Sequence, residues 1–194
     1  MQTIYSAEFM QDNCACYSKE KVKLEKYLKG RKKISYLDII ESDIPLKDKY
    51  WFFCKKVFTQ EQNQRISLIV AEIVLPLYEE KYPDNKAPRE AIEATKLYIK
   101  GEITSEQLLI KRRAAINAAA YAAADADADA YYAAAATYAA AAAAYYAADY
   151  AAYAAAAAYY AAAAVDAAVD AAASSDDSYK QKLEKALMDF IESN

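Results

Sequence analysis

The sequence predicts an all-α fold, a compact multi-helix bundle, and three observations support this class. Apolar residues recur at three- and four-residue spacing through residues 1–113, which is the period of one face of a helix. Residues that begin or end helices border those runs, and no segment shows the alternation of a strand with comparable clarity. From residue 104 to residue 173 the chain holds neither proline nor glycine. With 194 residues, 56% of them apolar, we expect one domain over residues 1–194.

The first elements are short helices with recognisable ends. Ser18 suits the N-cap of a helix over residues 19–29, and Gly30 suits the residue that follows its last turn. Ser35 starts a short helix that carries two isoleucines. Pro45 suits the first turn of the next helix, because the amide that proline lacks has no partner there. That helix carries a cluster of apolar side chains: Tyr50, Trp51, Phe53, Cys54 and Val57.

The clearest core helix begins after Thr59. Thr59 and Gln62 have the spacing of a capping box, in which each side chain binds the backbone amide of the other residue. Pro76 removes one backbone donor and is expected to bend the last turn, and the segment 82–85 ends the helix. The apolar stripe of this helix consists of Ile66, Ile69, Val70, Ile73, Val74 and Leu77.

Two further helices follow. Pro88 opens the first and Gly101 closes it. Thr104 and Gln107 form a second capping box for the next helix. The side chains of the first of these helices expected to face inward are Ala91, Ile92, Leu97 and Ile99.

The composition changes abruptly after Arg113. Residues 1–113 form a conventional helical part with a net charge of +4, whereas residues 114–194 carry −8 and are largely alanine and tyrosine up to residue 173. A single helix over 104–173 would be about 100 Å long, far beyond a compact radius of gyration of about 16 Å. We therefore expect the alanine- and tyrosine-rich segment 114–173 to fold back as helical hairpins, with breaks near 125–129 and 148–149. A terminal amphipathic helix over 178–192 would bury Leu183, Leu187, Phe190 and Ile191.

The tyrosines of this segment follow a seven-residue spacing in two adjacent registers. One register holds Tyr131, Tyr138, Tyr145 and Tyr159, and the other holds Tyr132, Tyr146, Tyr153 and Tyr160. Adjacent registers make one broad stripe along a helix, and such a stripe is more often core packing than a binding surface.

The composition excludes most catalytic chemistry. The chain has no histidine, so it lacks imidazole acid-base groups and histidine metal ligands. Its two glycines are too few for a glycine-rich phosphate loop. Three cysteines form neither a disulfide framework nor a zinc site, and the Cys14/Cys16 pair lacks further ligands. The acidic run 125–129 lacks the glycine and the terminal acid of a calcium loop. We expect no catalytic residues, no metal and no cofactor.

Two segments carry a resemblance to a known family. Residues 65–96 read RISLIVAEIVLPLYEEKYPDNKAPREAIEATK, and Lys100-Gly-Glu-Ile and the alanine repeats follow. With the upstream Asp48-Lys-Tyr-Trp-Phe-Phe, these residues resemble an alanine-rich immunity protein family that was first described beside polymorphic toxins and has many bacteriophage relatives. The likeness covers roughly residues 45–150. It implies an all-helical, non-enzymatic protein that neutralises a target. Relatives often place histidine or arginine among the alanines, where this chain has Asn117, tyrosine and aspartate.

Candidate ligand-binding residues gather at the junction of the two parts. Arginine forms a planar fork of donors that suits phosphate or carboxylate, and tyrosine rings can stack on a base. A solvated helix face, or ion pairs with Glu106 and Asp125, would also explain the basic residues, and Arg89 with Glu93 suits a surface ion pair. The candidates are Lys111, Arg112, Arg113, Asn117, Tyr121 and Arg89.

Three functions remain open. The first is a binding protein that neutralises a toxin or defence system by sequestration, in its sharpest form a phage counter-defence protein that captures a small anionic, nucleotide-like immune signal. The second is an immunity protein that binds a protein toxin directly, and the third is a self-assembling helical element that forms homo-oligomers. We expect neither a membrane nor duplex nucleic acid as partner. The longest uncharged stretch lies between Asp149 and Asp166, too short to span a bilayer. Without a signal peptide at the start, we expect a location in the cytoplasm of a bacterial host cell.

Overall fold

A computed structural model describes residues 4–6, 33–124 and 177–194. The predicted helix over 19–29, the tyrosine stripe, Cys14, Cys16 and the acidic run 125–129 lie outside the described residues, as do the expected breaks and hairpins of the segment 125–176. In chain order the elements are β1 (Ile4–Ser6), β2 (Lys33–Ser35), α3 (Tyr36–Ile40), α4 (Leu46–Phe52), a π-helix (Phe53–Val57), α5 (Gln60–Lys81), α6 (Ala87–Ile99), α7 (Ser105–Ala124) and α10 (Asp177–Glu192).

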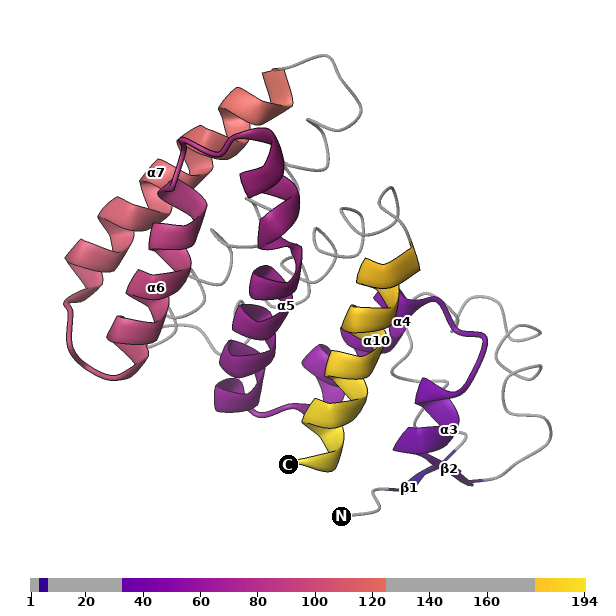
Figure 1. The fold of residues 1–194 in the computed structure, drawn as a ribbon. Coiled ribbons are helices and arrows are strands. Elements are labelled where there is room, and N and C mark those ends of the chain that lie inside the picture. The colour runs from indigo at the N-terminus through magenta and orange to yellow at the C-terminus, as the bar shows by residue number, and fades with distance from the viewer. Residues whose placement is uncertain (1–3, 7–32, 125–176) are drawn as a thin grey trace.

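The described elements pack around α5. It contacts α6 on one side and α10 on the other, and α7 lies beyond α6 (Figure 1). The predicted all-α class is confirmed. The structure adds β1 and β2, which pair antiparallel with Ile4 opposite Ser35. Strands of three residues are too short for a two-residue alternation to show in the sequence, so this pair was not predicted.

The core helix α5 begins where the sequence places it. The Thr59 side chain accepts a hydrogen bond from the Gln62 amide at 3.3 Å, and the Thr59 amide donates to Gln62 Oε1 at 2.8 Å. Both bonds satisfy amides that the first turn of a helix leaves without partners. The helix ends at Lys81 and contains Pro76, as predicted. Of the predicted stripe, Ile66, Val70 and Val74 are fully buried, whereas Ile69, Ile73 and Leu77 are partly buried.

The segment before α5 contains a π-helix that the sequence did not indicate. The Phe58 amide donates to the Phe53 carbonyl, five residues back, at 2.8 Å. In such a turn the amide bonds to the carbonyl five residues back instead of four, so a carbonyl next to the turn is left without a backbone partner. The buried Asn63 side chain donates from Nδ2 to the Cys54 carbonyl at 2.9 Å. Asn63 therefore fixes the π-helix to the first turns of α5.

A tight turn joins α6 and α7. Gly101 has a φ of +75°, in the left-handed region that favours glycine. Its amide donates to the Tyr98 carbonyl at 2.9 Å, and the Glu102 amide donates to the Leu97 carbonyl at 2.9 Å. These two bonds are the Schellman arrangement that ends a helix. Pro88 lies in the first turn of α6, as predicted, but the expectation that Ile99 faces inward is wrong, because its side chain is 45% exposed next to this turn.

The terminal helix α10 closes the core from the far end of the chain. Leu183, Leu187 and Phe190 are buried and Ile191 is partly buried, which confirms the predicted stripe. The buried Tyr50 hydroxyl donates to the Leu183 carbonyl at 2.7 Å, so α4 and α10 are joined by a hydrogen bond as well as by packing. Burial raises the pKa of Tyr50 well above its ordinary value, because the ionised form would lose its hydration.

Within the described helices, none is both long and apolar enough to cross a bilayer.

The buried stripe of α10 gives a stability prediction. Replacing Leu187 by Ala removes buried methyl groups and leaves a cavity, so we expect the free energy of unfolding to fall by about 2–5 kcal/mol. Replacing Met188 by Ala is the matched control, because its side chain is 36% exposed, and should cost less than about 1 kcal/mol. Urea denaturation followed by circular dichroism measures both. Equal losses for the two variants would show that α10 does not bury Leu187 as described.

Candidate functional site

The candidate residues lie on α6 and α7, which pack against each other. α7 begins with the predicted second capping box: the Thr104 amide donates to Gln107 Oε1 at 2.9 Å, and the Gln107 amide donates to Thr104 Oγ1 at 3.3 Å. α7 runs without interruption through Arg113 to Ala124, so the change in composition falls inside a helix. The buried residues of α7 are one leucine in the first turn and, beyond it, alanines: Leu108, Ala115, Ala118, Ala119 and Ala122. Small side chains bring α7 close to α6, and Ala91 packs with Ala115.

Between Ile110 and Tyr121, the opposite face of α7 carries four exposed side chains larger than alanine, which we name the α7 strip: Ile110, Arg113, Asn117 and Tyr121. At about 100° per residue these four span an arc of about 80°. Ile110 is 63% exposed and Tyr121 is 69% exposed, unusual values for large apolar or aromatic side chains. Three of the six candidate residues therefore lie together on one outward face, and Ile110 joins them.

Lys111 points away from the strip. Its Nζ atom lies 2.9 Å from Glu90 Oε2, and this ion pair links α7 to α6. Both side chains are about half exposed, so the pair contributes up to about 1 kcal/mol. The sequence offered Glu106 and Asp125 as carboxylate partners for this basic cluster, whereas the carboxylate that Lys111 binds comes from the neighbouring helix.

Arg89 binds Glu79 on α5. Its Nε and Nη2 atoms donate to the two carboxylate oxygens of Glu79, the two-pronged geometry that arginine favours. The hydrogen bond from Arg89 lowers the pKa of Glu79, and the same bond raises the pKa of Arg89. The sequence suggested Glu93 as the partner, but Glu93 binds Lys96, at 2.8 Å. Lys96 also binds Glu72 of α5, at 2.6 Å.

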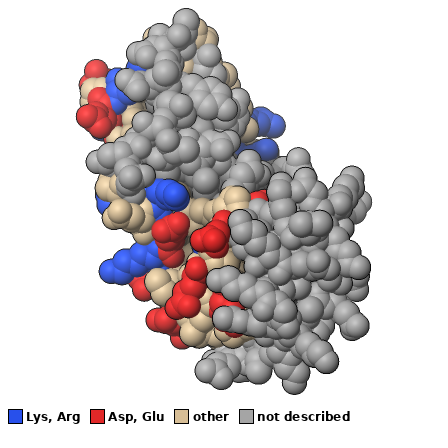
Figure 2. All heavy atoms as spheres, turned by 90° about the vertical axis from the view of Figure 1, so that its right-hand side faces the viewer, with Lys and Arg blue, Asp and Glu red and all other residues tan. Residues whose placement is uncertain are grey.

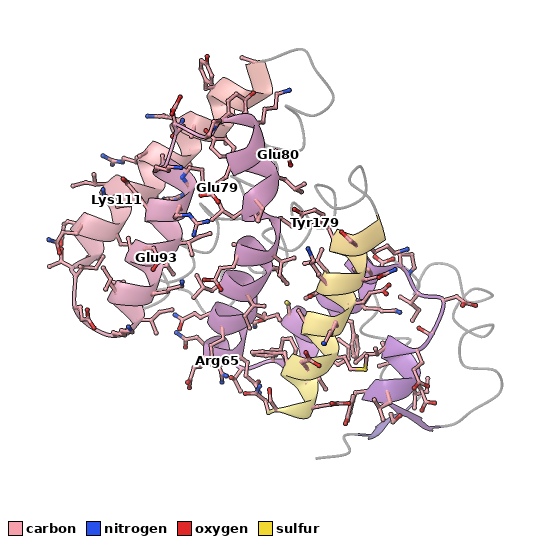
Figure 3. All side chains as sticks on the ribbon, in the orientation of Figure 1. Arg65, Glu79, Glu80, Glu93, Lys111 and Tyr179 are labelled. Atoms are coloured by element: carbon pink, nitrogen blue, oxygen red, sulfur yellow. The ribbon has the colours of Figure 1, made fainter. Side chains whose placement is uncertain are left out.

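These ion pairs fix the α5–α6–α7 layer, along which Glu79, Glu93 and Lys111 lie (Figure 3). Arg112 is partly buried and, as the residue before Arg113, lies about 100° round α7 from it. The six candidates thus do not converge on one point. Arg89 and Lys111 bind carboxylates of neighbouring helices, Arg112 lies beside the strip, and Arg113, Asn117 and Tyr121 form it.

Tyr121 rests on a column of aromatic rings that the sequence did not indicate. Its ring meets Tyr82 edge to face, with centroids 6.1 Å apart, and Tyr82 lies against Tyr78 at 5.0 Å. Tyr78 is fully buried, and burial raises the pKa of its hydroxyl. The only local signal was the four-residue spacing of Tyr78 and Tyr82 at the end of α5. We name these three residues the tyrosine column; it connects the exposed ring of Tyr121 to the core.

Charges of both signs lie side by side on the described surface. On the face seen in Figure 2, acidic side chains gather in the middle of the described residues and basic ones adjoin them. Recognition of duplex nucleic acid needs a continuous basic surface, and the described part of this face presents a mixed one. Among the described residues, no group of three or more histidine, cysteine, aspartate or glutamate side chains is placed to hold a metal ion.

A family model described as "Imm-5 like putative immunity protein" matches residues 58–189. The chain belongs to this family. The matched range begins just before α5 and ends within α10, so it contains the whole α7 strip and the tyrosine column. It starts after the Asp48-Lys-Tyr-Trp-Phe-Phe segment, which belongs to the resemblance described under Sequence analysis, and it extends beyond residue 150. No curated protein and no solved structure matches the chain.

The Arg89–Glu79 pair gives a pH prediction. The pKa of Glu79 is lower in the folded chain than in the unfolded chain, where it is about 4.3. As the pH falls, the unfolded chain therefore takes up the proton first, and the stabilisation by this pair is lost as the pH drops through the folded pKa. Replacing Arg89 by Met should cost up to about 1 kcal/mol at pH 7. The cost should shrink as the pH falls below about 4.

Thermal unfolding between pH 7 and pH 3 measures this difference. Lys100→Met, an exposed cation at the end of the same helix, is the matched control. If both variants lose the same stability at every pH, the Arg89–Glu79 pair does not act as described.

Proposed function

We propose that this chain is an immunity protein that neutralises a toxin by binding it directly as a protein, and that the α7 strip makes the central contact. Membership of the immunity protein family supports the general role, since such proteins act on a toxin partner. The observation that carries the contact surface is the exposure of Ile110 and Tyr121 on one face of a helix whose other face is buried. Exposed apolar side chains that cluster on one surface mark interaction sites.

The composition of the strip suits a protein partner. Tyrosine and arginine are the side chains that most often dominate the binding energy of protein interfaces. Ile110 and Tyr121 supply apolar area, while Arg113 and Asn117 supply hydrogen bonds that orient the partner. The packing of α7 on α6 holds the strip in place, so little conformational entropy is lost on binding.

The role is binding rather than catalysis. The family is generally non-enzymatic, and the chain contains no histidine. The ion pairs of the α5–α6–α7 layer also support this proposal, because they hold the carboxylates Glu72, Glu79 and Glu90 against cations. Carboxylates held in this way are poor candidates for proton transfer.

Capture of a nucleotide-type immune signal by a phage counter-defence protein is the second candidate. Arg113, Asn117 and Tyr121 follow one another at four-residue spacing, and they offer a cation, an amide and an aromatic face to such a ligand. Against it, Lys111 and Arg89 already bind carboxylates, which would have to be displaced before either could bind phosphate. We therefore place direct binding of a protein toxin first.

The test uses growth rescue. Toxin domains of the polymorphic type are expressed singly from an inducible promoter in a bacterium that also expresses this chain, and a neutralised toxin restores growth. We expect the rescuing pair to co-purify as a stable complex. The double variant Arg113→Glu/Tyr121→Ala should weaken the complex at least about 100-fold, the effect of losing two central contacts, and should abolish rescue.

Lys185→Glu/Ile99→Ala is the matched control, because it makes the same kinds of change at exposed positions away from the strip, and it should rescue fully. Thermal-shift measurements with cyclic nucleotides and cyclic ADP-ribose-type molecules test the second candidate. A thermal shift that Arg113→Glu abolishes, without a protein complex, would favour the nucleotide. Full rescue by the strip variant would show that the toxin binds elsewhere.

A further inference from the structure

We infer that the surface that docks on the α7 strip is an acidic amphipathic helix of the partner protein, packed along α7. This inference rests on the proposed function and adds the chemistry of the partner. It depends on three features of the described residues: the shape of the strip, its charge, and the ring contacts that hold Tyr121 in place.

The shape of the strip suits a helix. Arg113, Asn117 and Tyr121 form one row at four-residue spacing, and the adjacent row runs from the partly buried Arg112 and Ile116 to the exposed Ala120 and Ala124. Rows at this spacing are the ridges that pack into the grooves of a second helix, and the small side chains of Ala120 and Ala124 widen the groove beside Tyr121. From Ile110 to Tyr121 the strip is about 16 Å long, which matches about three turns of a partner helix.

The charge of the strip favours an acidic partner. Between residues 107 and 124 the chain has three basic side chains and no acidic one. Lys111 binds Glu90, while Arg113 is exposed one turn after Ile110, at one edge of the arc that the strip covers. A cation that a partner covers loses hydration, and a carboxylate of the partner compensates for this loss. The nearest acid of the same face, Glu106, lies one turn before Ile110, at the edge of the strip.

Two copies of the described part of α7 do not meet these requirements. In a two-fold contact the strip would lie against itself. Arg113 could then meet Glu106 of the other copy only if the axis passed near Ile110, and Tyr121 would lie outside the contact. The ring of Tyr121, which is largely exposed, would then remain uncovered. A partner with its own acidic residues covers the whole strip.

The tyrosine column makes Tyr121 the apolar anchor of this contact. Its ring is held edge to face by Tyr82, and Tyr82 is held by the buried Tyr78. A side chain that is already positioned loses less entropy on binding, which raises its share of the affinity. We therefore expect Tyr121 to matter for every helix that binds, whatever its charge, and Arg113 to select the acidic ones.

The test uses a displayed helix library as the probe. One amphipathic helix of fixed leucine pattern is displayed on yeast, with its flanking positions randomised among Glu, Gln and Lys, and sorted for binding to the full-length protein. Glu should be enriched at least about tenfold over Lys in the selected clones, the scale of a charge-pair preference. The same sort against Arg113→Glu should enrich Lys instead. Lys185→Glu changes the net charge equally and should select the same acidic clones as the wild type.

Further readouts separate the explanations. Tyr121→Ala should weaken every selected clone at least about tenfold without changing the preferred charge. Circular dichroism of each variant confirms that the fold is retained. The inference is overturned if no clone binds, if Glu is not enriched, or if Arg113→Glu and Lys185→Glu behave alike. Growth rescue is a separate measurement. If the strip variant abolishes rescue but the library shows no preference for Glu, the proposed function is retained and only the acidic helix is refuted.

Discussion

The burial of α5 between α6 and α10 is the constraint on which the rest of the described structure depends. Its fully buried side chains, among them Ile66, Val70 and Tyr78, need partners on more than one side. One partner, α6, follows directly in the chain, while the other, α10, comes from the far end. The hydrogen bond from Tyr50 to Leu183 adds a specific polar contact to this packing. Because α7 packs mainly on α6 and reaches the α5 core through Ala118 and Ala122, the position of the α7 strip follows from the burial of α5.

The sequence was most informative where structure is decided locally. The capping boxes at Thr59 and Thr104 and the glycine after α6 were read correctly, because each depends on residues within one turn of the helix end. The π-helix is held by Asn63, which binds a carbonyl nine residues earlier in the chain. Ile99 lies exposed beside the turn between α6 and α7. Neither of these features could be predicted from helical spacing alone.

The candidate residues show the same difference between features decided within one helix and features decided by contacts between helices. Arg112 and Arg113 are adjacent in sequence, but adjacent residues of a helix point about 100° apart, so a cluster of charge in the sequence is not a cluster in space. The partners that the structure gives Lys111 and Arg89 come from other helices, Glu90 of α6 and Glu79 of α5, and the sequence indicated neither of them. Arg113, Asn117 and Tyr121 were grouped correctly because their four-residue spacing places them on one face. Ile110 and the tyrosine column became apparent only from exposure and ring contacts in the folded chain.

The nearly all-alanine buried face of α7 has an evolutionary consequence. The buried contacts of α7 come mainly from alanines, and the Lys111–Glu90 ion pair also links it to α6, whereas Ile110, Arg113 and Asn117 lie on the exposed face. Substitutions at these three positions are therefore expected to leave the packing of the helix pair as it was. Under the proposed function, such a helix allows the protein to follow a changing toxin by single substitutions on its exposed face. The separation of the supporting face from the exposed face then leaves the specificity free to diverge while the fold is conserved.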